Sequence, residues 1–297
     1  MITFSATKIL SAFRFPRLTL IGLCLLSTAA TPDDPDRADL RLSRIEGVEI
    51  GAPTTAPRAL PPDLRQALDD ARAALDDGRT ADALIGLYRL RERGAAADYF
   101  EIAMLEALID ERSGNSVGGI EAARRAVTLR PASPDAHALL GGFYLRAGDM
   151  DPAIAQLRTA TAAGKRQLSN PRITRAWFEL GEALEQAGYF SAAVEAYSEF
   201  DFTIWESNPE HRNAAELRDL IRLYPHGAFE REVTLLARLG RVDERLAATR
   251  AALERWPDDP DIERSYVSSL LAAKHAERAF EFGKKRVVGP GASKGLL

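Results

Sequence analysis

Several features that would mark a specialised class of protein are scarce in this sequence. Its 297 residues include one cysteine, 21 glycines and 16 prolines, and 7% of them are aromatic. A disulfide-rich scaffold, a collagen-like chain or a low-complexity chain would need far more Cys, Gly or Pro. With 46% hydrophobic and 28% charged residues, the composition is that of an ordinary globular protein.

The motifs that carry catalysis or hold metals are also missing. The sequence has no G-x-S-x-G elbow, no phosphate-binding G-x-x-x-x-G-K-[ST] loop, no H-E-x-x-H and no C-x-x-C. The histidines are widely separated, and we interpret His137 as a packing residue rather than a ligand. Acidic pairs such as Asp258-Asp259 lie near expected helix ends, where capping explains them. We therefore predict a protein that is not an enzyme and binds no cofactor or metal. A hydrolase with its site in residues 201–225 is the enzymatic alternative.

The first thirty residues have the order of a secretory signal peptide. Lys8, Arg14 and Arg17 precede an apolar run over residues 18–26, and small residues follow up to Ala30. The run is shorter than the roughly 20 residues that cross a bilayer, so we expect cleavage near Ala30 and no stable membrane span afterwards. An uncleaved anchor and an organellar transit peptide are the alternatives.

This signal has consequences for the compartment. Cys24 follows Leu23, whereas the lipid-modified cysteine of a lipoprotein follows a small residue, so we interpret Cys24 as an apolar residue of the signal. Cleavage removes this cysteine, which makes the mature chain compatible with an oxidising compartment. It also removes three cations and no acid from a chain whose net charge is −4, and this acidity disfavours nucleic-acid binding. We expect a periplasmic or secreted protein, or one anchored to the membrane by an uncleaved signal.

Residues 31–62 and 290–297 flank the folded region. The first segment contains TPDDPD, GAPTTAP and LPP, and this density of Pro and Gly predicts a mostly extended linker. We expect Ile45, Val48 and Ile50 to dock on the first helices. The second segment is expected to be a flexible tail.

The region between them contains a repeat. From residue 174 the sequence has the spacing W-x2-L-G-x2-L-x3-G-x4-A-x3-Y, and the frame returns from residue 134. Weaker copies begin near residues 64, 100, 226 and 260, and the starts at 100 and 134 are 34 residues apart. The residues that carry the two full copies are Trp177, Leu180, Gly181, Leu184, Gly188, Ala193 and Tyr197, and Leu140, Gly141, Tyr144, Gly148, Ala153, Leu157 and Ala160.

This pattern resembles the tetratricopeptide repeat family. The resemblance implies an all-α, right-handed α-solenoid of antiparallel helix pairs, here about six pairs over residues 63–289. Small residues such as Gly181 and Ala193 suit the close crossing of two helices, and Gly188 suits the turn between them. Each pair leaves an apolar face that only the next pair can cover.

Two insertions interrupt the repeat. We expect a loop over residues 165–170, between the third and fourth copies. Residues 201–225 form a longer insertion, in which the spacing of Leu217, Leu220, Ile221 and Tyr224 predicts an extra amphipathic helix over 211–223. Packing on the core is the favoured role of this helix, and a partner-binding surface is the alternative.

The resemblance also indicates where binding would occur, because the first helix of each pair lines a concave groove in this family. The lysine and asparagine clamp that some members use for a terminal carboxylate is missing. What remains is a mixed apolar and arginine lining that suits an extended or helical peptide, although each arginine could simply be solvated. The candidate residues are Met104, Leu108, Arg112, Leu145, Arg146, Arg175, Phe178, Glu182, Arg231, Thr234 and Arg238.

We therefore predict a non-catalytic scaffold of the cell envelope that binds a protein or peptide. The alternative is a docking or regulatory module of a larger envelope enzyme or complex. The last expected helix, about 275–288, is followed only by GPGASKGLL, with no polar capping helix. This terminal pair has a polar face of its own, or self-associates, or adjoins further domains.

Overall fold

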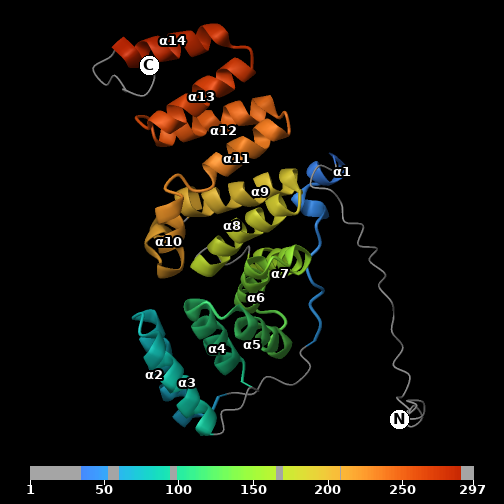
Figure 1. Ribbon diagram of the computed structural model, residues 1–297, viewed down its shortest axis with the longest axis vertical. Coiled ribbons are helices and arrows are strands. Elements are labelled where there is room, and N and C mark those ends of the chain that lie inside the picture. Colours follow the sequence, from blue (N-terminus) through green and yellow to red (C-terminus); the bar gives the residue numbers. More distant parts are fainter. Residues whose placement is uncertain (1–34, 53–59, 94–98, 165–169, 208, 289–297) are drawn as a thin grey trace, which may run out of the picture. The chain divides into compact units, whose positions relative to one another are not determined.

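A computed structural model of the chain describes residues 35–52, 60–93, 99–164, 170–207 and 209–288 (Figure 1). Within these ranges every regular element is a helix. The expected signal peptide at 1–30, most of the 165–170 loop and the tail at 290–297 lie outside the described residues. The prediction of an all-α solenoid is confirmed.

Twelve of the described helices form antiparallel pairs, and the second helix of one pair contacts the next pair along the chain. The pairs are α2 (Pro62–Asp76) with α3 (Thr80–Glu92), α4 (Phe100–Ser113) with α5 (Ser116–Leu129), α6 (Pro134–Ala147) with α7 (Met150–Gly164), α8 (Pro171–Gln186) with α9 (Phe190–Asp201), α11 (Phe229–Arg238) with α12 (Val242–Arg255), and α13 (Pro260–Ala272) with α14 (Ala276–Val288).

Local sequence sets the ends of these helices. At the start of α6 the Ser133 side chain accepts a hydrogen bond from the Ala136 N–H, and Pro134 occupies the first helical turn. The helix ends at Gly148, whose φ of +82° is a left-handed conformation that glycine adopts at little cost. Asn170 begins α8 in the same way as Ser133 begins α6, by accepting from the Arg172 N–H.

The close crossing predicted at Gly181 is present between α8 and α9. A Cβ at this position would collide with the ring of Tyr197, which is fully buried. Trp177, Leu180 and Phe200 surround the same contact and belong to the largest apolar cluster among the described residues. This cluster fixes the third and fourth pairs, on which the insertion is mounted.

The insertion after α9 is helical throughout its described part. It begins with a π-helical turn, η2 (Phe202–Ser207), continues through the short η3 (Pro209–Asn213) and ends in α10 (Ala215–Leu223). Leu217 of α10 is fully buried, and the helix contacts α8. The extra helix therefore packs on the core and begins four residues later than the sequence pattern predicts.

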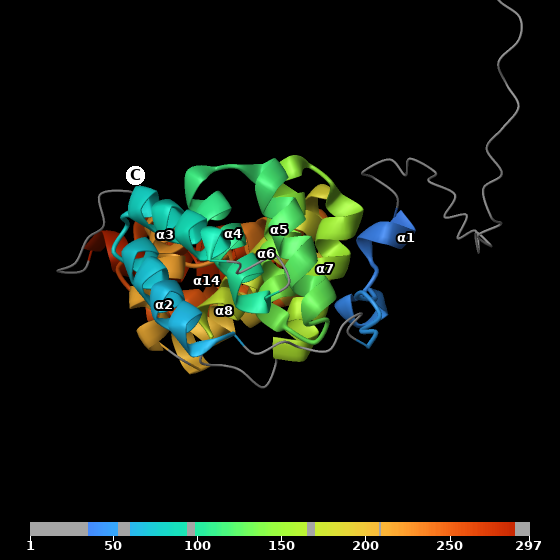
Figure 2. The same cartoon turned by 90° about the horizontal axis from the view of Figure 1, so that it is seen from below.

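The segment before α2 docks away from the first helices, contrary to our expectation. It contains α1 (Pro35–Ala38) and the 3-10 turn η1 (Leu42–Arg44), which contact α9 (Figure 1). In Figure 2, α1 lies at the opposite edge from α2 and α3. Arg158 of α7 donates to the Ile45 carbonyl at 3.1 Å, and Thr159 accepts from the Val48 N–H at 2.6 Å. The cause is Leu42, which is buried in the cluster of the third and fourth pairs. We call residues 37–48 the strap.

Candidate functional site

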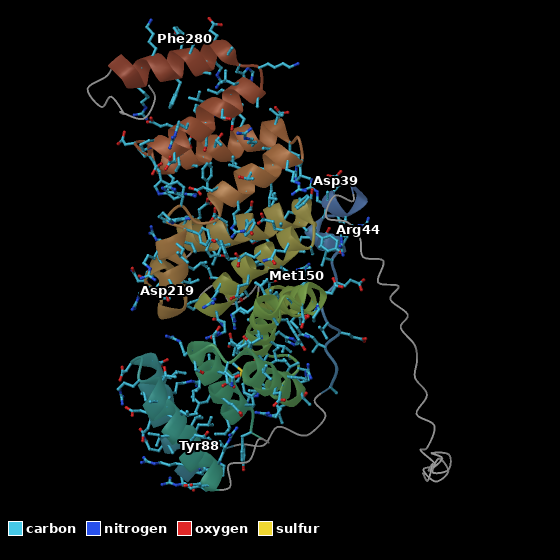
Figure 3. All side chains as sticks on the ribbon, viewed as in Figure 1. Asp39, Arg44, Tyr88, Met150, Asp219 and Phe280 are labelled. Atoms are coloured by element: carbon cyan, nitrogen blue, oxygen red, sulfur yellow. The ribbon has the colours of Figure 1, made fainter. Side chains whose placement is uncertain are left out.

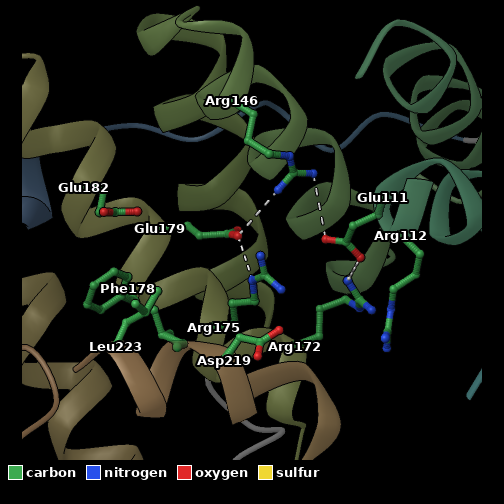
Figure 4. A pocket seen from close by; sticks show the side chains of 11 residues that line it. Glu111, Arg112, Arg146, Arg172, Arg175, Phe178, Glu179, Glu182, Asp219 and Leu223 are labelled. Carbon is green, nitrogen blue, oxygen red and sulfur yellow. Dashed lines mark hydrogen bonds and ion pairs between the residues drawn. The ribbon is translucent and has the colours of Figure 1, made fainter. Parts of the chain in front are cut away.

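A cavity of about 420 Å³ lies beside the first helices of three consecutive pairs, α4, α6 and α8, with α10 on its other side (Figure 4). We call it the central cavity. Its lining residues are Glu111, Arg112, Arg146, Arg172, Arg175, Phe178, Glu179, Glu182, Asp219, Leu220 and Leu223. Arginines and carboxylates make up most of this lining, which indicates a site that recognises charge.

Five of the residues selected from the sequence meet at this cavity. They are Arg112 of α4, Arg146 of α6, and Arg175, Phe178 and Glu182 of α8. Their spacing was enough to find them, because Arg112 and Arg146 are 34 residues apart, and Arg175, Phe178 and Glu182 follow at intervals of three and four residues on one side of α8.

The cavity contains an ion-pair network that joins α4, α6 and α8. Arg172 Nη1 lies 3.2 Å from Glu111 Oε2, and Arg175 Nε lies 2.8 Å from Glu179 Oε1. Arg146 lies between the two carboxylates, 3.8 Å from Glu111 and 3.9 Å from Glu179. Arg146 is therefore held loosely by two acids on different helices, while Arg172 and Arg175 are each held closely by one.

Burial and neighbouring charges together shift the pKa values of Glu111 and Glu182, two acids of the central cavity, in opposite directions. Burial by itself would raise the pKa of Glu111, but the guanidinium groups of Arg172, Arg175 and Arg146 lower that pKa below its ordinary value. Glu111 is therefore ionised at neutral pH. For Glu182 burial dominates and raises the pKa, although Arg231 opposes the shift.

Arg112 is the arginine of the central cavity that takes no part in this network. It is exposed and, among the described residues, makes no ion pair (Figure 4). Leu223 of α10, an apolar side chain that is 69% exposed, lies at the same cavity. A guanidinium free to bind two carboxylate oxygens and an apolar contact are thus presented together.

Phe178 borders the cavity, but its role differs from the one predicted. It is 1% exposed, because its ring packs between Phe200 and Tyr224, with centroids 5.1 Å and 4.9 Å away. The insertion supplies Tyr224, so it covers a ring that would otherwise lie open in the groove. Phe178 is a core residue, and the prediction that it contacts a partner is corrected.

Arg231 and Glu182 also have a different role, because they bind each other. Arg231 Nη2 lies 3.0 Å from Glu182 Oε1, and its Nη1 lies 3.0 Å from Glu185 Oε2. Arg231 also donates to the Tyr224 hydroxyl at 2.9 Å. Through these bonds Arg231 connects α11 with α8 and with the end of α10.

The other candidates do not reach the central cavity. Met104 is buried in the core of α4, α5 and α6, and Leu108 and Leu145 are half-buried against the same helices or their neighbours. Arg238 stacks on Phe190, with its guanidinium carbon 4.0 Å from the ring centroid. Thr234 lines a second cavity, of about 490 Å³, beside α11 and α13. The prediction that Met104 lies on the binding surface is therefore wrong.

Sequence reasoning missed six of the lining residues. Glu179 had a signal, since it stands four residues after Arg175 and such spacing favours a helical ion pair. Glu111 directly precedes the selected Arg112, and Arg172 lies one helical turn before the selected Arg175. Leu220 was part of the predicted amphipathic helix, but neither it nor Asp219 and Leu223 could be assigned to this cavity, because nothing in the repeat pattern places α10 on α8.

No other chemical site is evident in the part of the chain that the structure describes. His137 is buried, with its ring nitrogens 2.6 Å from Gln156 Oε1 and 2.7 Å from the Pro131 carbonyl. Asp259 caps α13 by accepting from two backbone N–H groups, as its position predicted. The described side chains include no group of His, Cys, Asp and Glu suited to a metal ion. None of the described helices has the length and apolar content that a membrane span requires.

Comparison with known proteins identifies the repeat. The family model described as "Tetratricopeptide repeat" matches residues 104–167 and 144–209. No match was found among curated proteins. Among solved structures, PilW, described as a widely conserved type IV pilus biogenesis factor, is 13% identical, with 80% of this chain and 98% of PilW aligned at a TM-score of 0.50. At this identity the likeness concerns the fold alone.

Two further structures align less well. MamA is 15% identical over 63% of this chain and 90% of its own, at a TM-score of 0.45. A thermophilic TPR protein of Thermus thermophilus is 21% identical over 70% of this chain and 99% of its own, at a TM-score of 0.41. Residues 104–209 are therefore tetratricopeptide repeats, and the helix pairs on either side of them stack in the same way.

Proposed function

We propose that the chain binds a partner polypeptide in the central cavity and acts as a scaffold without catalysing a reaction. Tetratricopeptide solenoids serve as scaffolds for protein–protein interaction, and the central cavity brings together charged and apolar side chains from three consecutive helix pairs and α10. The observation that carries the proposal is Arg112, an exposed guanidinium without an ion pair among the described residues, beside the loosely held Arg146.

The chemistry of the lining specifies the partner. A carboxylate could bind Arg112 directly and attract Arg146, whose existing contacts of 3.8 Å and 3.9 Å are long for ion pairs. Leu223 would take an apolar side chain near that carboxylate. We therefore expect a short segment with an acidic group and an apolar anchor close together. Arg172 and Arg175 would keep their partners and hold the shape of the site.

A peptide selection tests this proposal on the full chain. A random peptide library is panned against the purified protein, and the enriched peptides are synthesised and titrated. The expected peptides combine acidic and apolar residues. Their affinity should fall about tenfold or more in an Arg112→Glu, Arg146→Glu double variant, because two favourable charges become repulsive. Arg250→Glu, an exposed site on α12 outside both cavities, is the matched control and should bind normally.

Two results would contradict the proposal. Peptides that bind the double variant as well as the wild type would place the binding surface outside the central cavity. A selection that enriches no peptide would contradict peptide binding itself. Circular dichroism of each variant would show that the helices are retained.

We further propose that the scaffold works in the cell envelope, as a periplasmic or secreted protein. The support is the order of basic, apolar and small residues in positions 1–30. N-terminal sequencing of protein recovered from the envelope fraction should begin near Thr31. A chain that begins at Met1 and stays with the cytoplasmic fraction would contradict export, and one that begins at Met1 in the membrane fraction would contradict cleavage.

A further inference from the structure

Helix α3 has two apolar faces, and one of them packs against the neighbouring helices of the same chain. Ala83, Leu87 and Leu90 are buried and belong to the cluster shared with α2 and α4. A second apolar stripe lies on the exposed side, at positions i, i+3, i+4 and i+7 of the helix. Its residues are Ala81, Leu84, Ile85 and Tyr88. A helix of a soluble monomer normally presents polar residues on this side.

The exposure of this stripe is substantial. Tyr88, which is labelled in Figure 3, is 55% exposed, Ile85 is 48% exposed and Leu84 is 38% exposed. Spacing of this kind is how one amphipathic helix anchors to another. None of the four stripe residues lines the central cavity, so the stripe is a separate surface.

We propose that the α3 stripe binds the α3 stripe of a second copy of this chain, in an antiparallel two-fold dimer. The stripe is complementary to itself in that arrangement. The two-fold axis then passes between Leu84 and Ile85. Leu84 of each copy faces Ile85 of the other, and the large Tyr88 faces the small Ala81 of the second copy. A two-fold axis requires this kind of self-complementary surface.

The charges beside the stripe agree with the same arrangement. Asp82 and Arg89 lie on one flank of α3, two helical turns apart, and both are exposed. In an antiparallel dimer the Asp82 of each copy approaches the Arg89 of the other, which gives two ion pairs at the rim. Asp82 already contacts Arg79 on the surface at 2.9 Å, an exposed pair that competes weakly.

The C-terminal pair is a poorer candidate for self-association than we expected from the sequence. Phe280 of α14 is 68% exposed (Figure 3), but among the described side chains the small Ala276 is its one exposed apolar neighbour three or four residues away. The other exposed residues around it on α14 are the charged Glu277, Glu281 and Lys284. We therefore assign self-association to α3 and use Phe280 as the control position.

The mass of the full chain in solution tests the dimer, by sedimentation across a range of concentrations. Wild type should reach twice the monomer mass. Tyr88→Glu should raise the dissociation constant about tenfold or more, because a charge then faces an apolar centre. Phe280→Glu should leave dimerisation unchanged. Circular dichroism of both variants separates a lost interface from a lost fold.

A charge exchange tests the two-fold geometry specifically. Asp82→Arg alone should weaken the dimer, because it meets Arg89 of the second copy. Asp82→Arg with Arg89→Asp in the same chain should restore the affinity, since each copy then supplies both halves of the exchanged pair. A monomeric wild type would overturn the proposal. Loss of the dimer in Phe280→Glu, or failure of the double exchange to restore it, would overturn the α3 assignment.

Discussion

Arg231 on α11 donates a hydrogen bond to the hydroxyl of Tyr224, which directly follows α10, over 2.9 Å. The same tyrosine ring lies on Phe178 of α8. Tyr224 therefore connects α10 and α11 with the more distant α8, through a polar contact on one side and an aromatic contact on the other. This contact holds the end of α10, whose Asp219, Leu220 and Leu223 line the central cavity, against α8.

Two substitutions of Tyr224 separate these contacts. Tyr224→Phe removes the acceptor of the Arg231 hydrogen bond and keeps the ring, so we expect the free energy of unfolding to fall by about 1 kcal/mol. Tyr224→Ala also uncovers Phe178 and should cost about 3 kcal/mol or more. Urea unfolding followed by circular dichroism measures both. Equal losses in the two variants would mean that the aromatic contact contributes nothing.

The helix pairs could be predicted from the sequence, while the position of the insertion could not. Gly181 has an equivalent in Gly141 of the preceding repeat, and the physical reason for both glycines, a close helix crossing, is local to one pair. The contact of Tyr224 with Phe178 depends on how a non-repeating segment folds back. Its spacing indicates a helix but carries no information on which surface that helix covers.

The same distinction applies to the binding site and to the strap. Arg112, Arg146 and Arg175 could be predicted because they lie on the first helices of the repeats, on the side expected to line the groove. Phe178 was mistaken for a surface residue because its cover comes from outside the repeat. Leu42 had no helical pattern around it, so nothing in the sequence showed that it reaches the third and fourth pairs.

Asp201 gives a pH dependence to stability. Its side chain accepts from the Ala228 N–H at 2.8 Å, at the start of α11. Burial raises the pKa of this carboxyl from 3.8 to about 8, although the backbone hydrogen bond opposes the shift. Between these two values the unfolded chain has released the proton and the folded chain keeps it. Asp201 therefore makes the folded state less stable as the pH rises from about 4 to about 8.

Asp201→Asn isolates this effect, because asparagine keeps an acceptor for the Ala228 N–H and does not titrate. The free energy of unfolding of the variant minus that of wild type should increase with pH across this window, by at most about 1.4 kcal/mol per pH unit. Urea unfolding of both proteins at several values between pH 5 and pH 8 gives the difference, in which other titrating groups cancel. A difference independent of pH would contradict the raised pKa.

The strap offers a prediction about docking. Leu42 is buried among residues of the third and fourth pairs, whereas Ile50, just past the strap, is 48% exposed. Leu42→Ala should lower the free energy of unfolding by about 2 to 3 kcal/mol and speed hydrogen exchange at the Val48 N–H, which Thr159 holds. Ile50→Ala is the matched control and should change stability by less than about 0.5 kcal/mol. Equal effects from the two variants would indicate that the strap is not docked.

Two glycines in helices should respond to alanine with opposite signs. At Gly181 of α8 an added Cβ would collide with the buried ring of Tyr197, so Gly181→Ala should destabilise the protein by about 1 to 3 kcal/mol. At Gly283 of α14 an added Cβ meets no atom within 4 Å, so Gly283→Ala gains only the better helix propensity of alanine, about 0.5 to 1 kcal/mol. Thermal unfolding of the two variants beside wild type measures both shifts. A stabilising effect of Gly181→Ala as well would contradict this close crossing. The added methyl group fits beside the buried Tyr197 ring only if α8 and α9 lie further apart.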